Sequence, residues 1–126
     1  MDTDAVEPAG NHSALTIRID LLRPGVPVVH ADGRLDPLTA PDLRRLLHEQ
    51  LDAAPWAIVL DLSALSVLAP GAVPALVQVL RRAARADIGL YLVTADDTVC
   101  QALATAGSPE LFEIHPTTEA ALRALG

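Results

Sequence analysis

The chain has 126 residues, of which 51% are hydrophobic and 20% charged, and its formal net charge is −7. Its nine basic residues are all arginine, which excludes a P-loop or a Schiff base, and an acidic chain without a basic stripe is poorly suited to bind nucleic acid. No apolar run reaches the ~18 residues of a membrane span, and the single cysteine, Cys100, leaves no internal disulfide and indicates a reducing cytoplasm.

The N-terminal part of the chain divides into a tail and a pair of strands. Residues 1–13 are polar, acidic and unpatterned, which is typical of a disordered tail, and we expect a single domain over 14–126. Hydrophobic and polar residues alternate over 15–21, which predicts a half-buried strand. A Pro-Gly turn and a second strand over 26–31 complete a predicted hairpin.

Two helices and two further strands are predicted in the middle of the chain. Thr39 is the expected N-cap of the first helix, with Pro41 in its first turn. Residues 58–60 form a continuous apolar run, which is typical of a strand covered on both faces. A second helix, with apolar residues at helical spacing over 73–80, is followed by a strand over 88–93.

The last part of the chain continues the alternation of helices and strands. We expect a helix over 98–106 that ends at Gly107, a short strand over 111–114 and a final helix over 117–125. This order predicts an α/β domain, with a mixed central sheet of about five strands and about four helices packed against it.

No constellation of catalytic or metal-binding residues stands out in the sequence. Asp61 ends the central strand, where its side chain is expected to bond the backbone of the next turn. Cys100 is expected to be a small buried hydrophobic residue. None of the four histidines has the spacing of a metal-ligand pair: His12, His30, His48 and His115. We therefore expect a protein that is not an enzyme and holds no metal or cofactor.

Three segments in one register carry a family resemblance: Gly33-Arg34-Leu35-Asp36, Asp61-Leu62-Ser63, and Leu103 with Gly107 and Leu111-Phe112. Together they resemble the STAS domain, and more narrowly the bacterial anti-sigma factor antagonists. The likeness covers nearly the whole chain from Leu15. It implies a STAS-type fold and a small regulator of transcription that binds an anti-sigma factor, often a serine kinase, and so frees a sigma factor.

The same resemblance implies a phosphorylation site that this chain has lost. In the family, an Asp-Ser-Ser/Thr-Gly turn opens the second helix, and phosphorylation of its serine inactivates the antagonist. Carried over residue by residue, the aspartate becomes Ala69, the phosphoacceptor Pro70, the next hydroxyl residue Gly71 and the glycine Ala72. The resemblance therefore implies a docking turn without its phosphoswitch.

The prolines of this turn constrain where the second helix begins. Because proline is tolerated in a first turn but not in a helix interior, Pro74 favours a helix that starts at about Ala72, after an extended apolar loop over 68–71. Ser63 and Ser66 are the nearest hydroxyl residues, and both lie upstream of this start. Whether either is phosphorylated instead stays open at this point.

Three functions are compatible with these observations. The first is phosphorylation-independent binding of an anti-sigma factor or a related serine-kinase-type regulator, through eight predicted contact residues: Asp36, Thr39, Leu68, Ala69, Pro70, Gly71, Val73 and Pro74. The second is a small-molecule-sensing STAS domain or a subunit of a larger signalling complex. The third is self-association through the same apolar loop or through the edge strand.

Overall fold

The computed structural model describes residues 14–106 and 113–125. The elements in chain order are β2 (Leu15–Arg23), β3 (Val26–Leu35), α2 (Ala40–Asp52), β4 (Ala57–Asp61), β5 (Leu65–Leu68), the 3-10 turn η1 (Pro70–Ala72), α3 (Val73–Arg85), β6 (Gly89–Val93), α4 (Asp97–Ala106), β7 (Glu113–His115) and α5 (Thr118–Leu125). The predicted α/β class is confirmed. The predicted tail over 1–13 and the predicted helix end at Gly107 lie outside the described residues.

The described strands form one six-stranded mixed sheet in the order β2-β3-β4-β6-β7, with β5 pairing with β3 outside this path. The predicted hairpin is confirmed, since β2 and β3 pair antiparallel with Ile17 opposite Ala31. The other four pairings are parallel. β3 therefore has three partners, because it pairs with β2 on one side, and on the other its residues 28–30 pair with β4 and its last residues with β5.

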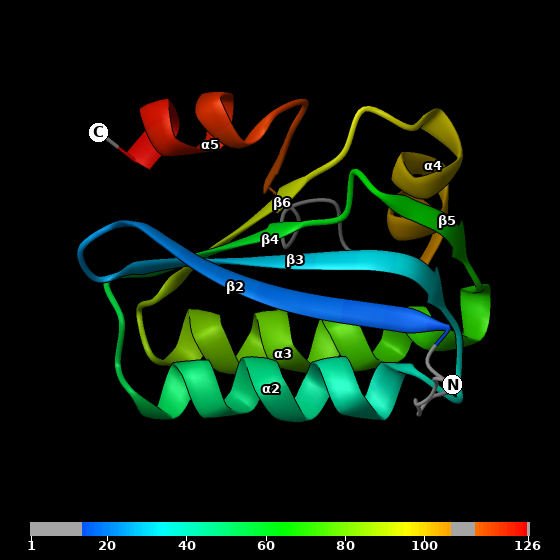
Figure 1. The fold of residues 1–126 in the computed structure, drawn as a ribbon. Helices are drawn as coiled ribbons and strands as arrows, with labels where there is room; N and C mark the ends of the chain where they lie inside the picture. The colour runs from blue at the N-terminus through cyan, green and yellow to red at the C-terminus, as the bar shows by residue number, and fades with distance from the viewer. Residues whose placement is uncertain (1–13, 107–112, 126) are drawn as a thin grey trace, which may run out of the picture.

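Helices cover both faces of the sheet. α2 and α3 lie side by side on one face, and α5 lies against the other (Figure 1). Ile58 and Leu60 belong to the core under α2 and α3, whereas Val59 belongs to the smaller core under α5. The prediction of a strand covered on both faces is confirmed, because all three residues are fully buried.

The sixth strand, β5, is not predicted by the sequence, because Leu65 is buried but Ser66 and Val67 are exposed, so no regular alternation marks it. Backbone hydrogen bonds hold it instead. The Gly33 N–H donates to Ala64 O at 3.1 Å, and the Ala69 N–H donates to Leu35 O at 2.9 Å. β5 thus ties the chain before α3 to the end of β3.

Gly33 lets the start of β2 approach the end of β3 closely. Its φ is +108°, and a Cβ at this position would lie 2.3 Å from the carbonyl oxygen of Ala14. A side chain is therefore excluded sterically as well as by backbone conformation. This explains the glycine that opens the first family-like segment.

The start of α3 differs from the prediction. The α-helix begins at Val73, one residue after the expected start, with Pro74 in its first turn. The extended loop predicted over 68–71 is wrong, because Leu68 ends β5 and Pro70–Ala72 form a 3-10 turn. The cause is Pro74, which has no N–H for the carbonyl of Pro70, so that carbonyl accepts from the Val73 N–H three residues on.

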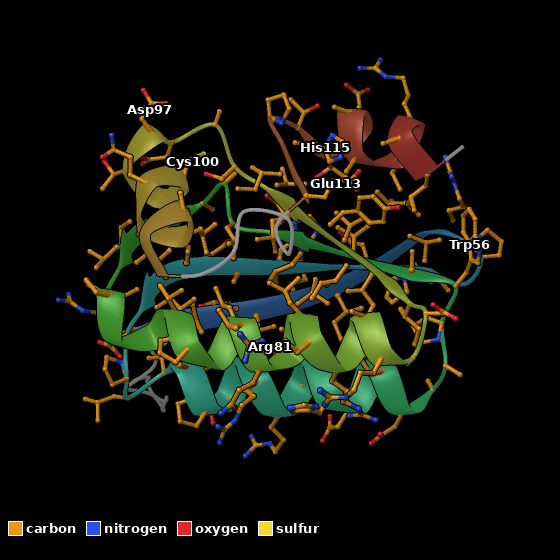
Figure 2. The ribbon with its side chains drawn as sticks, turned by 180° about the vertical axis from the view of Figure 1, so that it is seen from behind. Trp56, Arg81, Asp97, Cys100, Glu113 and His115 are labelled. Atoms are coloured by element: carbon orange, nitrogen blue, oxygen red, sulfur yellow. The ribbon has the colours of Figure 1, made fainter. Side chains whose placement is uncertain are left out.

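Figure 2 shows the side chains from the opposite side, with Trp56 and Cys100 among those labelled. Trp56, just before β4, is 58% exposed. Cys100 on α4 is half-buried, less buried than expected, whereas Val99 beside it belongs to the core. Of the strand predicted over 111–114, the structure describes β7, which ends one residue later than predicted, at His115. No helix among residues 14–106 and 113–125 is long and apolar enough to cross a membrane.

Candidate docking surface

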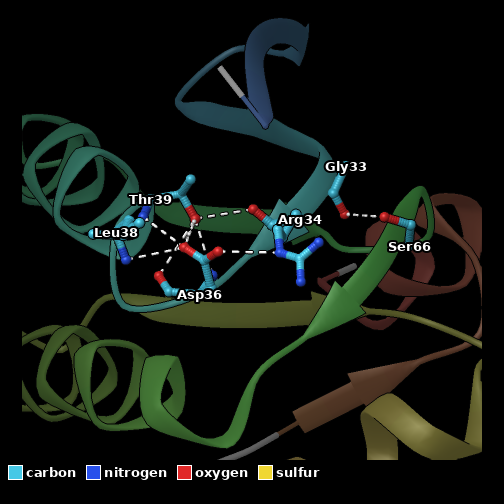
Figure 3. A network of polar contacts seen from close by, with 6 residues as sticks. All are labelled: Gly33, Arg34, Asp36, Leu38, Thr39 and Ser66. Atoms are coloured by element: carbon cyan, nitrogen blue, oxygen red, sulfur yellow. Dashed lines mark hydrogen bonds and ion pairs between the residues drawn. The ribbon is translucent and has the colours of Figure 1, made fainter. Parts of the chain in front are cut away.

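The turn before α2 is built around the carboxylate of Asp36 (Figure 3). Its Oδ1 accepts hydrogen bonds from the N–H groups of Leu38, at 2.9 Å, and Thr39, at 3.0 Å. The Thr39 hydroxyl in turn accepts from the Asp36 N–H at 2.9 Å and donates to Arg34 O at 2.9 Å. This is a reciprocal capping box with Asp36 in the N-cap role.

This geometry corrects the prediction for Thr39. It is the residue that precedes α2, but its hydroxyl makes no hydrogen bond to the first turn of that helix. The capping lies one turn earlier, where the Ala40 N–H donates to Asp36 O at 2.8 Å. Asp36 and Thr39 therefore use their polar groups to hold the turn rather than to present them to solvent.

The same contacts keep Asp36 ionised. The hydrogen bond from the Thr39 N–H holds the pKa of the Asp36 carboxyl below its ordinary value, and the Leu38 N–H and the Arg34 guanidinium act in the same direction. Partial burial opposes them and is outweighed. Arg34 Nε lies 3.2 Å from Asp36 Oδ2.

A bulge in β5 brings the turn before α3 close to the turn before α2. The register of β3 against β5 slips at Ser66, whose hydroxyl donates to Gly33 O at 3.0 Å (Figure 3). Gly71 then lies against Pro37, because a Cβ on Gly71 would be 3.0 Å from Pro37 Cγ. The two turns therefore form one continuous surface.

The turn before α3 is held without polar side chains. Neither η1 nor α3 has a side-chain cap hydrogen bond. Instead, the Ala72 N–H donates to Ala69 O at 2.9 Å, and Ala72 and Val73 are buried in the core. Pro70 and Gly71 are exposed.

Between the first turns of α2 and α3 lies an open groove of about 220 Å³. Its only charged side chain is Arg44, which donates a hydrogen bond to Gln78 Oε1 at 3.3 Å. The residues that line the groove, called the α2–α3 groove below, are Pro37, Ala40, Pro41, Arg44, Gly71, Pro74, Ala75 and Gln78. Leu38, next to it in the chain, is 88% exposed.

The predicted contact residues fall into three groups. Pro70, Gly71 and Pro74 are exposed, and the last two line the groove. Leu68 and Ala69 are partly buried, as are Asp36 and Thr39. Val73 is fully buried, so its assignment to an exposed contact surface is wrong: the residue faces the core because the helix turns it away from the groove.

Sequence reasoning missed most of the groove, although a signal for it exists. From Pro37, the lining residues recur at i, i+3, i+4 and i+7, and from Gly71 they recur at the same spacing. In each set the first three residues are proline, alanine or glycine and the fourth is a long polar residue, so the two sets predict two helix faces of the same kind. The α2–α3 groove is where these two faces meet.

A second polar cluster lies on the opposite face of the sheet. His30 Nδ1 is 2.8 Å from Asp61 Oδ2, and His30 Nε2 is 3.0 Å from Asp20 Oδ2. Asp61 Oδ1 accepts from the Ser63 N–H at 2.9 Å and from its hydroxyl at 2.6 Å. The predicted role of Asp61 in holding the next turn is confirmed.

The pKa of Asp61 reflects opposing effects. Partial burial is the largest and raises it, but the hydrogen bonds from Ser63 and His30 together outweigh burial and hold the pKa below its ordinary value. Among the residues that the structure describes, no group of three or more His, Cys, Asp or Glu side chains is placed to hold a metal ion.

Comparison with known proteins identifies the family. The STAS domain family matches residues 21–121. The chain belongs to this family, as the resemblance of its motifs indicated.

Several of the similar proteins are anti-sigma factor antagonists. The anti-sigma-F factor antagonist RsfA of Mycobacterium tuberculosis is 29% identical over 99 residues, which is 77% of each chain. An anti-sigma factor antagonist from Mycobacterium paratuberculosis has a similar crystal structure, with a TM-score of 0.75, 26% identity and coverage of 87% of this chain and 92% of that one. The unphosphorylated antagonist SpoIIAA shares the fold, with a TM-score of 0.72, 16% identity and coverage of 87% and 96%.

Proposed function

We propose that this protein is an anti-sigma factor antagonist that binds its anti-sigma factor without a serine phosphoswitch at the start of α3. The observation that carries the proposal is the turn Ala69–Pro70–Gly71, which keeps an ordered helix start beside the α2–α3 groove but has no hydroxyl. The names of its relatives support the antagonist role. The partner is an anti-sigma factor or a related serine-kinase-type regulator in the cytoplasm, and the role is binding rather than catalysis.

The physical case rests on what a phosphate does at such a position. A phosphoserine adds about −1.5 to −2 charges and repels a partner that must dock closely. Pro70 and Gly71 are exposed at the turn beside the α2–α3 groove, and neither can be phosphorylated. Docking at this surface would therefore be independent of the phosphorylation that controls other family members.

The nearest hydroxyl groups are poor substitutes for the lost phosphoacceptor. The Ser63 hydroxyl donates to Asp61 on the far side of the sheet from α2, and the Ser66 hydroxyl donates to Gly33 O within the β5 bulge. Neither lies at a helix start, where a phosphate is stabilised by backbone N–H groups. We propose that neither acts as the switch.

The size of the groove weighs against the small-molecule alternative. Ligand pockets enclose about 300–1,000 Å³, whereas the α2–α3 groove is open and measures about 220 Å³. A side chain of a partner protein fits such a groove better than a free ligand. The groove therefore favours a protein partner.

The test is affinity capture from the native cytoplasm with a matched pair of variants. Gly71→Glu places a charged side chain against Pro37 in the groove, and Ala124→Glu makes the same kind of change at an exposed site on α5. We expect the wild type and Ala124→Glu to retain an anti-sigma factor and Gly71→Glu to lose it at least about tenfold. Equal retention by the two variants, or no anti-sigma factor in any capture, would contradict the proposal.

A further inference from the structure

Strand β2 forms an edge of the sheet that the described residues build, and it exposes large apolar side chains. Ile19 is 41% exposed, Leu21 68% and Leu22 62%. A long edge strand with exposed apolar residues is a template for pairing with another chain. We propose that β2 pairs antiparallel with β2 of a second copy of this chain, about a two-fold axis at Ile19, to form a homodimer.

The hydrogen bonds within the hairpin determine which backbone groups of β2 face outward. The Arg34 N–H donates to Ala14 O at 2.8 Å, and residues 14 and 34 continue the register in which Leu15 lies opposite Gly33. Since hydrogen-bonded pairs alternate along an antiparallel ladder, Arg18 and Asp20 direct their backbone groups toward β3. Ile17 and Ile19 therefore direct theirs away from the sheet.

The charges on β2 select one register for a second copy. Pairing Ile19 with Ile19 of the second copy uses the outward backbone groups and places Arg18 opposite Asp20 of the other strand, twice. Moving the axis to residue 18 would place Arg18 opposite Arg18, and moving it to residue 20 would place Asp20 opposite Asp20. Opposite charges across a strand pair stabilise it and like charges destabilise it, so the strand is complementary to itself only about Ile19.

The apolar side chains agree with this register. Ile17 packs against the larger core, and Ile19 points to the same face because side chains alternate along a strand. Ile17 then lies opposite Leu21 of the second copy. The apolar side chains of Ile17, Ile19 and Leu21 in one copy would then cover those of the other copy, beside α2 of each. This is the isologous arrangement of a two-fold dimer.

The length of the ladder limits its strength. The register of β2 against β3 shifts between Asp20 and Arg23, and a bulge there twists the strand away from a partner. Five residues of each copy, 17–21, take part. We therefore expect a dissociation constant on the order of micromolar, as in small, transient interfaces.

This dimer leaves the α2–α3 groove uncovered. The groove lies between the first turns of α2 and α3, whereas Ile19 is the middle residue of β2. β2 lies at the edge of the described sheet (Figure 1). Each dimer would present two grooves. The inference does not depend on the proposed function.

A pair of charge-reversed variants tests the register directly. Arg18→Asp alone places two carboxylates opposite each other in a homodimer, and Asp20→Arg alone places two guanidinium groups together, so each protein is expected to be monomeric by analytical ultracentrifugation. Mixed one to one, the two variants restore a pairing of opposite charges in place of like charges, and we expect a heterodimer. Because Asp20 also bonds His30, circular dichroism of each variant is the check on folding.

Two further variants test whether the dimer forms through β2. Ile19→Lys changes an exposed residue at the proposed axis and should abolish dimerisation, whereas Leu38→Lys, beside the groove, should leave it unchanged. A wild type that stays monomeric up to about 1 mM, beyond which association is too weak to be specific, would overturn the inference. So would folded charge variants that fail to associate when mixed, or a dimer lost with Leu38→Lys and kept with Ile19→Lys.

Discussion

The turns before α2 and α3 share a proline spacing and are held together in different ways. Pro37 and Pro41 are four residues apart, as are Pro70 and Pro74, and in each pair the second proline lies in the first turn of the α-helix. Before α2, a carboxylate and a hydroxyl cap the chain. Before α3, the backbone and buried apolar side chains hold the turn.

A helix start can therefore be ordered without a polar side chain to cap it. Prolines fix the backbone angle at the start of each turn, and their missing N–H groups reduce the number of donors that need a cap. The turn before α3 also gains from the burial of Val73 at the position where the turn before α2 has Ala40. A turn without a hydroxyl can therefore hold the start of α3 beside the groove.

The largest expected effect comes from charging the buried residue of the polar-free turn. Val73→Asp places an unpaired carboxylate in the core and should lower the free energy of unfolding by about 4 kcal/mol or more. Urea denaturation measures this loss. A loss within about 0.5 kcal/mol, typical of surface positions, would show that burial of Val73 does not hold the turn.

The turn before α2 should instead be sensitive to its carboxylate. Asp36→Ala leaves the N–H groups of Leu38 and Thr39 without their acceptor, and we expect the Tm to fall by about 5 °C. Thr39→Val removes only the reciprocal hydroxyl and should cost less. Thermal unfolding of both variants would refute the capping box if neither changed the Tm.

The opposite change is predicted for the turn before α3. Ala69 already has the extended backbone of an N-cap residue, with φ −73° and ψ 139°. Ala69→Asp should therefore supply the missing cap and stabilise the protein by about 1 kcal/mol. Urea denaturation alongside Ala69→Val, which adds bulk without an acceptor, separates capping from packing; a destabilised Ala69→Asp would mean that the two turns are not equivalent.

The smallest effect is on the response to acid, which the two turns should not share. Because the pKa of folded Asp36 lies below its unfolded value, its contribution is fully present above about pH 4 and is lost as the pH falls through the folded pKa. Asp36→Asn should flatten the fall of stability below about pH 4, whereas Ala69→Asn should not. Urea midpoints over this pH range measure the difference, and identical acid slopes would argue against an ionised cap.

The fold was predictable because its elements follow simple periodicities. The apolar run over 58–60 corresponds to a strand with the expected burial. The alternation over 15–21 also corresponds to a strand, but Ile19 and Leu21 are exposed because β2 lies at the edge of the described sheet. The strand β5 was not predictable, because it is held by backbone hydrogen bonds to β3 that no side-chain pattern reveals. The 3-10 turn at Pro70 escaped prediction for a related reason, since it follows from which carbonyl loses its donor at Pro74.

The candidate site was predictable in its location but not in its chemistry. The family-like turn identified Pro70 and Gly71, which are exposed beside the groove. The helical spacing of the apolar residues over 73–80 already favoured the inward face for Val73, which conflicts with its assignment as a contact residue. The structure buries Val73, whereas Pro74 lines the groove. The sequence could not show that Asp36 takes the N-cap role and that the Thr39 hydroxyl is its reciprocal partner, since both residue types are good caps.

If docking needs no phosphate control at the start of α3, the anti-sigma factor should bind the wild-type chain without modifying it. To test this, the purified chain is incubated with its captured anti-sigma factor and ATP, and the intact mass and the bound fraction are followed together. A variant with Ala69→Asp and Pro70→Ser reports whether the partner phosphorylates a restored serine. We predict that the wild type keeps its mass and stays bound; a wild type that gains phosphate and is released would contradict the proposal.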